Sequence, residues 1–260
     1  MRIGVCFKIV PDYENVLPEE WKNPQQLDFT YVKKMYGCFD EPALEMALRI
    51  ADGCKAAGVE AETVAVTCGA PEGTVSDGLL RALFAAGFSD VVLLPASQEF
   101  TPAHTAKSLA SYFGANPADL ILTGRMAGPS DSGMVPYYLA EELGYTLFTD
   151  LTSAVWSEEA SAVEITCAGE DSRKIYRLSG PSVGTVGDAE AAYLRLFPLK
   201  ARMDAKKRVF SQWEEKVSSE ETKFTLQYEE KEADGKCRFI EAESAEAGAR
   251  KLIDILNGEG

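Results

Sequence analysis

Hydrophobic residues in the first half of the chain alternate between two patterns. Short apolar runs rich in β-branched residues predict strands over Ile3–Val10, Glu62–Cys68, Asp90–Leu94 and Asp119–Thr123. Between these runs, apolar residues recur at helical spacing, which predicts helices over Asp40–Gly58, Val75–Ala86, Pro102–Phe113 and Met134–Leu143. Strands that alternate with helices in this way form parallel sheets covered on both faces. The pattern therefore predicts an α/β fold with a doubly wound, mainly parallel sheet.

The middle of the chain shows a pattern in which short strands predominate. We expect a hairpin made of Ala162–Cys167 and Lys174–Leu178, followed by a strand over Ser182–Val186. The basic stretch Lys200–Trp213 is predicted to be helical. Because no second core is visible, residues 1–213 are expected to form one α/β domain.

Residues 214–260 are expected to form a C-terminal arm that ends in a helix. Glu214–Asp234 is dense in glutamate and lysine and has few apolar anchors, which is typical of a solvated or partner-bound segment. The helix is predicted over Glu243–Asn257, with Ser244 as its N-cap and Gly258 as its end.

Charge and composition exclude several classes of protein. The 260 residues include 41 acidic and 26 basic side chains, which gives a net charge of −15. Such an acidic chain lacks the basic surface that nucleic-acid binding requires. No apolar run approaches the roughly 20 residues of a membrane span. The opening Met1–Asp12 has no small-residue cleavage site and is not expected to be a signal peptide.

The six cysteines are scattered along the chain without a C-x-x-C pair. This spacing disfavours zinc binding and disulfide exchange, and no metal site is expected. We interpret the cysteines as reduced thiols in a cytoplasmic protein.

Open parallel sheets bind ligands beyond the carboxyl ends of their strands. The candidate residues at these positions are Cys6, Phe7, Lys8, Thr67, Cys68, Gly69, Gly124 and Arg125, with the loop that continues to Met134. Three glycines in that loop permit tight turns directly before a helix, and the N–H groups at the helix start would hold a phosphate. A plain strand-to-helix turn is the alternative, because neither G-x-G-x-x-G nor G-x-x-x-x-G-K-[ST] is present.

Catalytic constellations are sparse in this sequence. The only histidine, His104, follows Thr101-Pro102 at a helix start, where a surface or capping role is the usual one. Cys68 precedes a helix, but no second histidine or other base is available to activate its thiol. We therefore expect a protein that binds ligands and partners and is not a self-sufficient enzyme.

One strong positive cluster, Lys200–Arg208, stands out in the acidic chain, next to Leu196, Phe197 and Pro198. It has two interpretations. The cluster is either a solvated helix face or a docking surface in which an apolar anchor is surrounded by charge.

Several segments, in one order, resemble the β subunit of the electron transfer flavoproteins. The matching stretches are IGVCFKIVPD at Ile3–Asp12, FDEPALEMAL at Phe39–Leu48, the strand–helix–strand segment Val64–Leu94, DLILTGRMAG at Asp119–Gly128 with the turn Asp131-Ser132-Gly133, and MDAKKR at Met203–Arg208. The resemblance covers residues 1 to about 213, that is, the whole predicted α/β domain.

The resemblance implies a flavodoxin-like core, similar also to the adenine-nucleotide α-hydrolase fold, and an electron carrier rather than an enzyme. Such a β subunit pairs with a larger α subunit. The pair shuttles electrons from flavoprotein dehydrogenases, such as acyl-CoA dehydrogenases, to a quinone reductase or a comparable acceptor. The redox FAD lies largely on the α subunit, and the β subunit carries AMP or a second FAD.

The resemblance also implies positions for the contacts. Carried over by position and joined to the strand-end candidates, the nucleotide neighbours are Cys6, Phe7, Lys8, Gly37, Cys38, Thr67, Cys68, Gly69, Gly124, Arg125, Asp131, Ser132, Gly133, Met134 and Val135. The loop that docks partner dehydrogenases falls at Leu196, Phe197 and Pro198, and the C-terminal arm and helix of residues 214–260 would wrap onto the α subunit.

The sequence departs from the family pattern near the expected nucleotide. Gly37-Cys38 stands where the family has Asn-Pro, and Met126 and Met134 stand where it has glutamine. Side-chain ligands are thereby lost while main-chain ligands are kept, so AMP, FAD and an empty site all remain open.

Two other classes of protein share this kind of sheet. An ATP-pyrophosphatase-like enzyme would need S-G-G-x-D-S directly after the first strand, where Lys8–Asp12 reads KIVPD. A stand-alone nucleotide-binding module of the universal-stress type would need neither the basic Lys200–Arg208 stretch nor the trailing arm.

Overall fold

The computed structural model describes residues 1–16, 31–69, 74–94, 101–128, 131–169, 172–214 and 239–258. Nearly all of the predicted arm Glu214–Asp234, the residues Pro129 and Ser130 of the glycine-rich loop, and Cys237 lie outside these ranges. The described chain divides into two compact units, residues 1–224 and 225–260. The predicted boundary at residue 213 stays a prediction.

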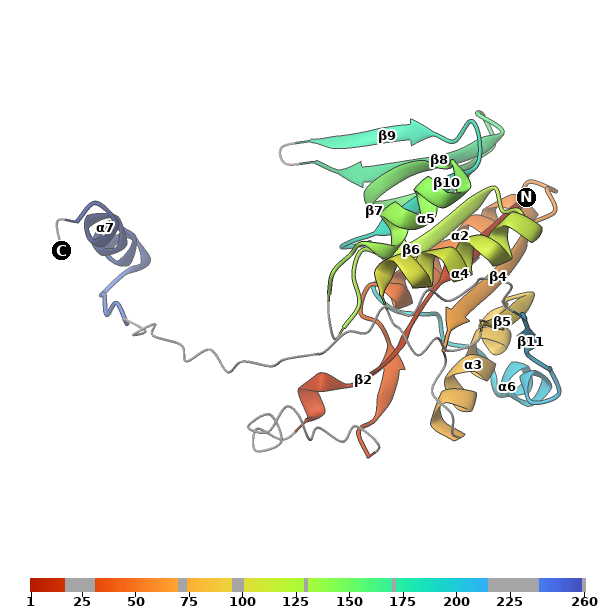
Figure 1. The fold of residues 1–260 in the computed structure, drawn as a ribbon. Coiled ribbons are helices and arrows are strands. Elements are labelled where there is room, and N and C mark those ends of the chain that lie inside the picture. Colours follow the sequence, from red (N-terminus) through yellow and green to blue (C-terminus); the bar gives the residue numbers. More distant parts are fainter. Residues whose placement is uncertain are drawn as a thin grey trace. The chain divides into compact units, whose positions relative to one another are not determined.

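The first unit is built on a nine-stranded sheet with the order β11-β5-β4-β1-β6-β10-β7-β8-β9 (Figure 1). Its strands are β1 (Arg2–Cys6), β4 (Glu62–Cys68), β5 (Asp90–Leu94), β6 (Leu120–Gly124), β7 (Thr146–Ser157), β8 (Ala162–Ala168), β9 (Arg173–Arg177), β10 (Ser182–Val186) and β11 (Ser211–Gln212). All neighbours from β11 to β7 pair in parallel, and β8 and β9 continue the sheet in antiparallel fashion.

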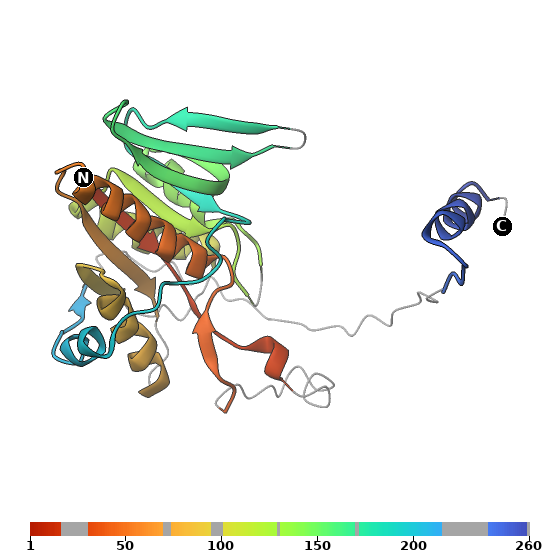
Figure 2. The same cartoon turned by 180° about the vertical axis from the view of Figure 1, so that it is seen from behind.

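Helices lie on both faces of the sheet. Those of the first unit are α2 (Asp40–Ala56), α3 (Thr74–Ala86), α4 (Pro102–Ala115), α5 (Val135–Leu143) and the short α6 (Leu199–Ala205). Figure 1 views the molecule from the side of α4 and α5, and Figure 2, from behind, has α2 in front. The predicted doubly wound, mainly parallel α/β fold is confirmed.

Each face has its own hydrophobic core, because successive side chains of a strand point to opposite sides. Ile3 and Val5 of β1, with Leu122 of β6, pack in the cluster that contains α2 and α3. Ile121 of β6 and Val66 of β4 pack in the cluster that contains α4 and α5. The continuous apolar runs read from the sequence are therefore strands that are buried on both sides.

Two predicted elements are corrected by the structure. The run Ile3–Val10 is not one strand: β1 ends at Cys6, and β2 (Ile9–Pro11) pairs with β3 (Lys34–Tyr36) in a separate two-stranded sheet. Lys200–Trp213 is not one helix, because α6 ends at Ala205 and β11 then pairs with β5. In both places a contact with a distant strand overrides the local pattern.

The second unit contains α7 (Ala245–Leu256), which confirms the predicted C-terminal helix. The Ser244 hydroxyl accepts a hydrogen bond from the N–H of Ala247 at 3.2 Å, as expected of an N-cap. Leu252, Ile253 and Leu256 form an exposed apolar face on this helix. In the part of the chain that is described, no helix is long and apolar enough to cross a membrane.

Candidate functional site

The order of the strands reverses between β1 and β6, and the region beyond the carboxyl ends of these two strands is called the crevice below. After β1 the chain adds β4 and β5 on one side, and then crosses to add β6 on the other side of β1. Cys6 is paired in register with Thr123, so the two strands end at the same level. Ligands of open α/β sheets bind at such a reversal of strand order, beyond the carboxyl ends.

Asp40, the first residue of α2, joins these two strand ends. Its Oδ2 accepts a hydrogen bond from the N–H of Lys8 at 2.9 Å, and its Oδ1 accepts one from the N–H of Gly124 at 3.1 Å. The residue is buried, with 4% of its surface exposed. A single carboxylate therefore satisfies two backbone donors that the ending strands leave unpaired.

Glycine is required next to this carboxylate. At Gly124, a Cβ atom would lie 2.5 Å from Asp40 Oδ1 and 2.9 Å from the Asp40 backbone nitrogen. At Gly37, a Cβ atom would overlap the other carboxylate oxygen of Asp40. The two glycines let the start of α2 approach the sheet closely enough for the carboxylate to reach both strands.

Burial raises the pKa of Asp40 to about 6. The hydrogen bonds from Lys8 and Gly124 and the charge of Lys8 act in the opposite direction, but burial outweighs them. The unfolded chain would have a pKa of about 3.9 at this residue. Between these values the folded chain holds a proton that the unfolded chain has lost. The contribution of Asp40 to stability is therefore largest below about pH 4 and is lost as the pH rises through about 6.

Comparison with the Asp40→Asn variant measures this effect. We expect the unfolding free energy of the wild type, minus that of the variant, to fall by about 2 kcal/mol between about pH 4.5 and about pH 7.5. Urea unfolding of both proteins at a series of pH values gives this difference, and subtraction cancels the other titrating groups. If the difference in unfolding free energy stays constant or grows with pH, the raised pKa given to Asp40 is wrong.

The start of α5 faces solvent beside the crevice and has no side-chain cap. Gly133 is in the left-handed region with φ of 63°, and Asp131 also has positive φ, at 45°. In the described part of the chain, the N–H groups of Ser132, Gly133 and Met134 have no hydrogen-bond acceptor. Free N–H groups at a helix start, together with the helix dipole, favour an anion.

The helix α4 provides a contrast. Its N-cap Thr101 accepts a hydrogen bond from the N–H of His104 at 3.1 Å. That helix start is therefore closed by its own sequence, whereas the start of α5 is open. His104 lies in the first turn of α4, where its backbone N–H is the group that Thr101 caps.

Lys8 connects β1 to the loop that precedes α5. Its Nζ donates a hydrogen bond to the carbonyl oxygen of Gly128 at 2.7 Å. Gly128 in turn lies against Tyr13, since a Cβ atom there would be 2.8 Å from the Tyr13 ring. This contact places a cation beside the crevice and holds the first part of the loop after β6 in place.

Cys6, at the end of β1, has a buried thiol. Burial, and then the nearby Cys68 and Asp40, raise the pKa of the Cys6 thiol well above its ordinary value. A thiol in such surroundings stays protonated and is a poor nucleophile.

A family model described as "Electron transfer flavoprotein domain" matches residues 37–218, more than half of the chain. The chain belongs to this family. The electron transfer flavoprotein subunit YgcR of Escherichia coli (strain K12), whose name marks the assignment as provisional, is 27% identical over 213 residues, which are 80% of this chain and 79% of the relative. The electron transfer flavoprotein subunit beta of Bradyrhizobium diazoefficiens is 28% identical over 208 residues, with 80% and 79% covered.

A third relative, electron transfer flavoprotein subunit beta of Chromohalobacter salexigens, is 31% identical over 117 residues, which are 44% of this chain and 42% of the relative. The resemblance to electron transfer flavoprotein β subunits, drawn from the sequence motifs, is confirmed. Proteins of this family are flavin-associated electron carriers.

The structure brings only some of the predicted nucleotide neighbours to the crevice. Those at or beside the ends of β1, β4 and β6 and the start of α5 are Cys6, Lys8, Gly37, Cys68, Gly124, Asp131, Ser132, Gly133, Met134 and Val135. Cys38 lies just before α2 with its thiol exposed, within electrostatic range of Asp40 and Asp131. Thr67 is buried in β4. Gly69 has positive φ and donates its N–H to Leu94, on the β5 side.

Two of the predicted neighbours have side chains that point elsewhere. Phe7 is a core residue whose ring packs edge-on against Tyr36, with the centroids 6.0 Å apart. The guanidinium carbon of Arg125 lies 4.3 Å from the centroid of the Phe39 ring. Arg125 also lines a separate cavity of about 290 Å³, and its Nη1 is 3.8 Å from Asp150 Oδ1.

The predicted docking residues lie on the segment between β10 and α6. Leu196 is 99% exposed, Phe197 packs against the core, and Pro198 is the N-cap of α6. The sequence analysis missed Asp40 as a site residue. The available signal was the FDE motif, which places the carboxylates of Asp40 and Glu41 in the first turn of the predicted helix.

Proposed function

We propose that this chain is the β-type subunit of an electron transfer flavoprotein. It pairs with an α subunit that carries the redox FAD, and it holds AMP, or a second FAD, in the crevice between β1 and β6. The pair accepts electrons from flavoprotein dehydrogenases and passes them to a quinone reductase or a comparable acceptor, in the cytoplasm.

One observation carries the nucleotide assignment: the uncapped start of α5 opens beside the strand ends that Asp40 joins. Its main-chain N–H groups from Ser132 to Met134 suit a phosphate, which both AMP and FAD contain. The neighbouring side chains of Met134 and Val135 have no hydrogen-bonding hydroxyl or amide groups. Recognition in this proposal is therefore of the phosphate by the backbone, which does not choose between the two nucleotides.

A bound flavin supplies the electron-transfer chemistry, and the residues of this chain only bind and orient. Asp40 ties the ends of β1 and β6 together, Lys8 holds the loop after β6, and the start of α5 would bind the phosphate of the nucleotide. The Cys6 thiol, whose pKa burial raises well above its ordinary value, is not suited to moving a proton for such a reaction. This arrangement supports a carrier subunit rather than an enzyme.

The test is to co-express the chain with its α subunit, purify the complex, release the bound nucleotides by heat, and identify them by mass spectrometry. We expect one adenine nucleotide per complex in addition to the FAD of the α subunit. If only that FAD is released, the nucleotide assignment is wrong.

The apolar face of α7 is proposed as the contact with the α subunit. Ile253→Asp and Leu256→Asp are each expected to weaken pairing with the α subunit at least about tenfold, because a carboxylate would replace a buried apolar contact. Sedimentation of the mixed subunits measures the pairing.

Lys251→Gln is the matched control for these variants, since it changes the net charge by the same amount on the same helix. It should pair as the wild type does. Thermal unfolding of the sheet unit should be unchanged in all three variants. Normal pairing of both aspartate variants would contradict the role of α7.

A further inference from the structure

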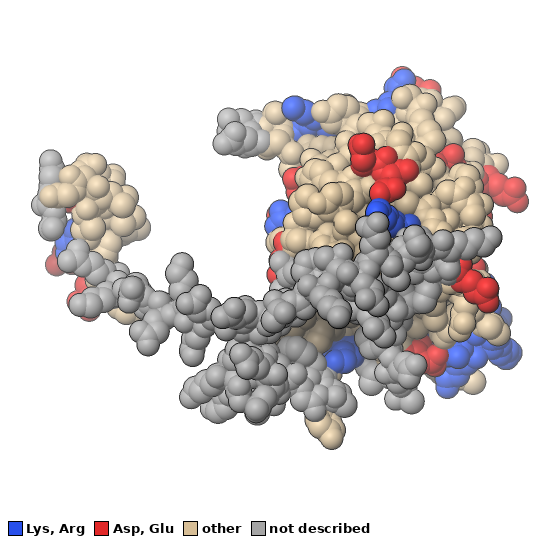
Figure 3. Space-filling model, in the orientation of Figure 1, with Lys and Arg blue, Asp and Glu red and all other residues tan. Residues whose placement is uncertain are grey.

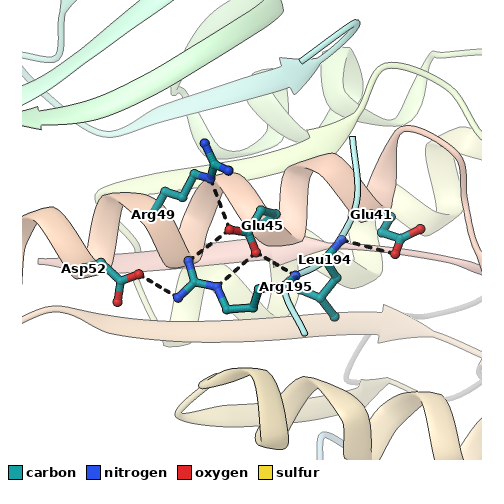
Figure 4. A network of polar contacts seen from close by, with 6 residues as sticks. All are labelled: Glu41, Glu45, Arg49, Asp52, Leu194 and Arg195. Carbon is teal, nitrogen blue, oxygen red and sulfur yellow. Dashed lines mark hydrogen bonds and ion pairs between the residues drawn. The ribbon is translucent and has the colours of Figure 1, made fainter. Parts of the chain in front are cut away.

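The segment before α6 is held against α2 by a network of charges (Figure 4). The guanidinium of Arg195 donates to both carboxylate oxygens of Glu45, each at 3.0 Å, and also to Asp52 Oδ2 at 2.6 Å. The backbone N–H of Arg195 donates to Glu45 as well, at 3.0 Å, and that of Leu194 donates to Glu41 at 3.2 Å. Both backbone and side chain of this irregular segment are therefore fixed.

Glu45 is buried on α2, with 4% of its surface exposed. Burial acts to raise the pKa of Glu45, but hydrogen bonds from Arg195 and Arg49 outweigh it and lower the pKa below its ordinary value. The carboxylate is therefore charged at neutral pH. A two-pronged contact between arginine and a buried carboxylate is among the most directional interactions that side chains make.

Leu196 follows Arg195 directly and has the opposite environment. It is 99% exposed, while the next residue, Phe197, is anchored in the core and Pro198 begins α6. Tyr193 and Leu199 nearby are 76% and 74% exposed. A large apolar side chain held in water between two fixed points is typical of a residue that a partner covers.

The exposed residues around Leu196 indicate the chemistry of that partner. Lys200, Arg202, Lys206 and Lys207 are exposed on and after α6. Figure 3 shows blue side chains gathered at the lower right, where Figure 1 places α6. Arg208 is used differently, since it donates to the Ser89 carbonyl oxygen and lies 4.5 Å over the Phe84 ring. The surface fits a protein with an apolar pocket surrounded by carboxylates.

We propose that Glu45 and Arg195 are positioning residues, which hold Leu196 in the conformation that the pocket of an acidic partner protein accepts. The inference rests on the proposed function, in which that partner is a flavoprotein dehydrogenase. Because the segment is ordered before binding, the partner does not have to order it, and affinity is gained without a new contact.

The first measurement is hydrogen–deuterium exchange of the complex with its α subunit. Exchange at the amides of Leu194 and Arg195 should be at least about tenfold faster in Glu45→Gln and in Arg195→Ala than in the wild type. Arg177→Ala is the control, because it removes an exposed ion pair with Glu164 on the outer hairpin. If the amides stay protected in both variants, the positioning role is wrong. General loss of protection would likewise overturn it, as it would show a purely structural effect.

The second measurement is electron transfer from a purified flavoprotein dehydrogenase that reduces the wild-type complex. We expect Leu196→Ala to raise the KM for the complex about tenfold with kcat unchanged, and Arg195→Ala to raise it about fivefold. If Arg195 acts through Leu196, the double variant is no worse than Leu196→Ala alone. Arg195→Lys should recover part of the effect, because it keeps the charge but not the two-pronged contact. The KM of the wild type should rise with salt.

The outcomes separate the two proposals. An unchanged KM for Leu196→Ala, or the absence of any dehydrogenase that reduces the wild type, would overturn the docking step of the proposed function and this inference with it. If Leu196→Ala raises the KM and Arg195→Ala does not, only the positioning role of Glu45 and Arg195 is overturned. Additive effects of the two changes on the KM of the double variant would also overturn that role alone.

Discussion

Replacing Gly133 by aspartate is expected to lower the affinity of the complex for AMP by at least about 100-fold, or about 2.7 kcal/mol. A Cβ atom at this position would lie 2.9 Å from the backbone oxygen of Arg125, and the φ of 63° already disfavours any side chain. The added carboxylate would also repel a phosphate at the start of α5. Titration calorimetry with AMP, together with mass spectrometry of the nucleotide retained on purification, measures the loss.

Gly144→Asp provides the matched control. Gly144 ends α5 with φ of 65°, so the variant has the same backbone strain and the same charge, but a Cβ atom there has nothing within 4 Å. We expect both variants to lose stability, the Gly133 variant more because of the contact with the Arg125 oxygen, and only the Gly133 variant to lose AMP. If the two variants retain equal amounts of nucleotide, the crevice is not the binding site.

Replacing Gly124 by alanine is expected to lower the unfolding free energy by about 3 kcal/mol. The new methyl group would collide with the Asp40 carboxylate and with the backbone of Phe39 and Asp40. The start of α2 would have to move away from β6, and the hydrogen bond from the Gly124 N–H would be lost. Urea unfolding of the full chain measures the change.

Gly114→Ala is the control for this prediction. Gly114 lies in α4 and has open space where a Cβ atom would be placed. Alanine in a helix restricts the unfolded chain and should stabilise the protein by about 0.4–1 kcal/mol. The two glycine-to-alanine substitutions should therefore change the unfolding free energy in opposite directions. If both lower it by a similar amount, the role given to Asp40 is wrong.

Much of the fold could be predicted from the sequence, because its periodicity reports burial directly. The strand Glu62–Cys68 and the helix from Asp40 emerge where the apolar pattern placed them. The break after Cys6 and the short strand β11 could not be predicted, because each depends on a partner strand far along the chain.

The candidate site divides in the same way. The glycines at positions 124 and 133 were found because glycines permit tight turns, and Gly133 does have the positive φ of such a turn. Gly124 instead lies in β6, where the close approach of Asp40 requires it. Asp40 was missed because its role exists only when the chain just after β1 and the end of β6, far apart in sequence, bring Lys8 and Gly124 together. Phe7 was included by its position after β1, although its side chain faces the core.

The two edges of the sheet differ in a way that bears on aggregation. At one edge, β11 pairs with β5, and the N–H of Trp213 donates to Leu93 at 3.0 Å. At the other, β9 is exposed along its whole length, but three of its five residues are Arg173, Lys174 and Arg177. Clustered charge on an edge strand repels a second copy. The sheet is therefore shielded from open-ended growth by a covering strand on one rim and by like charges on the other.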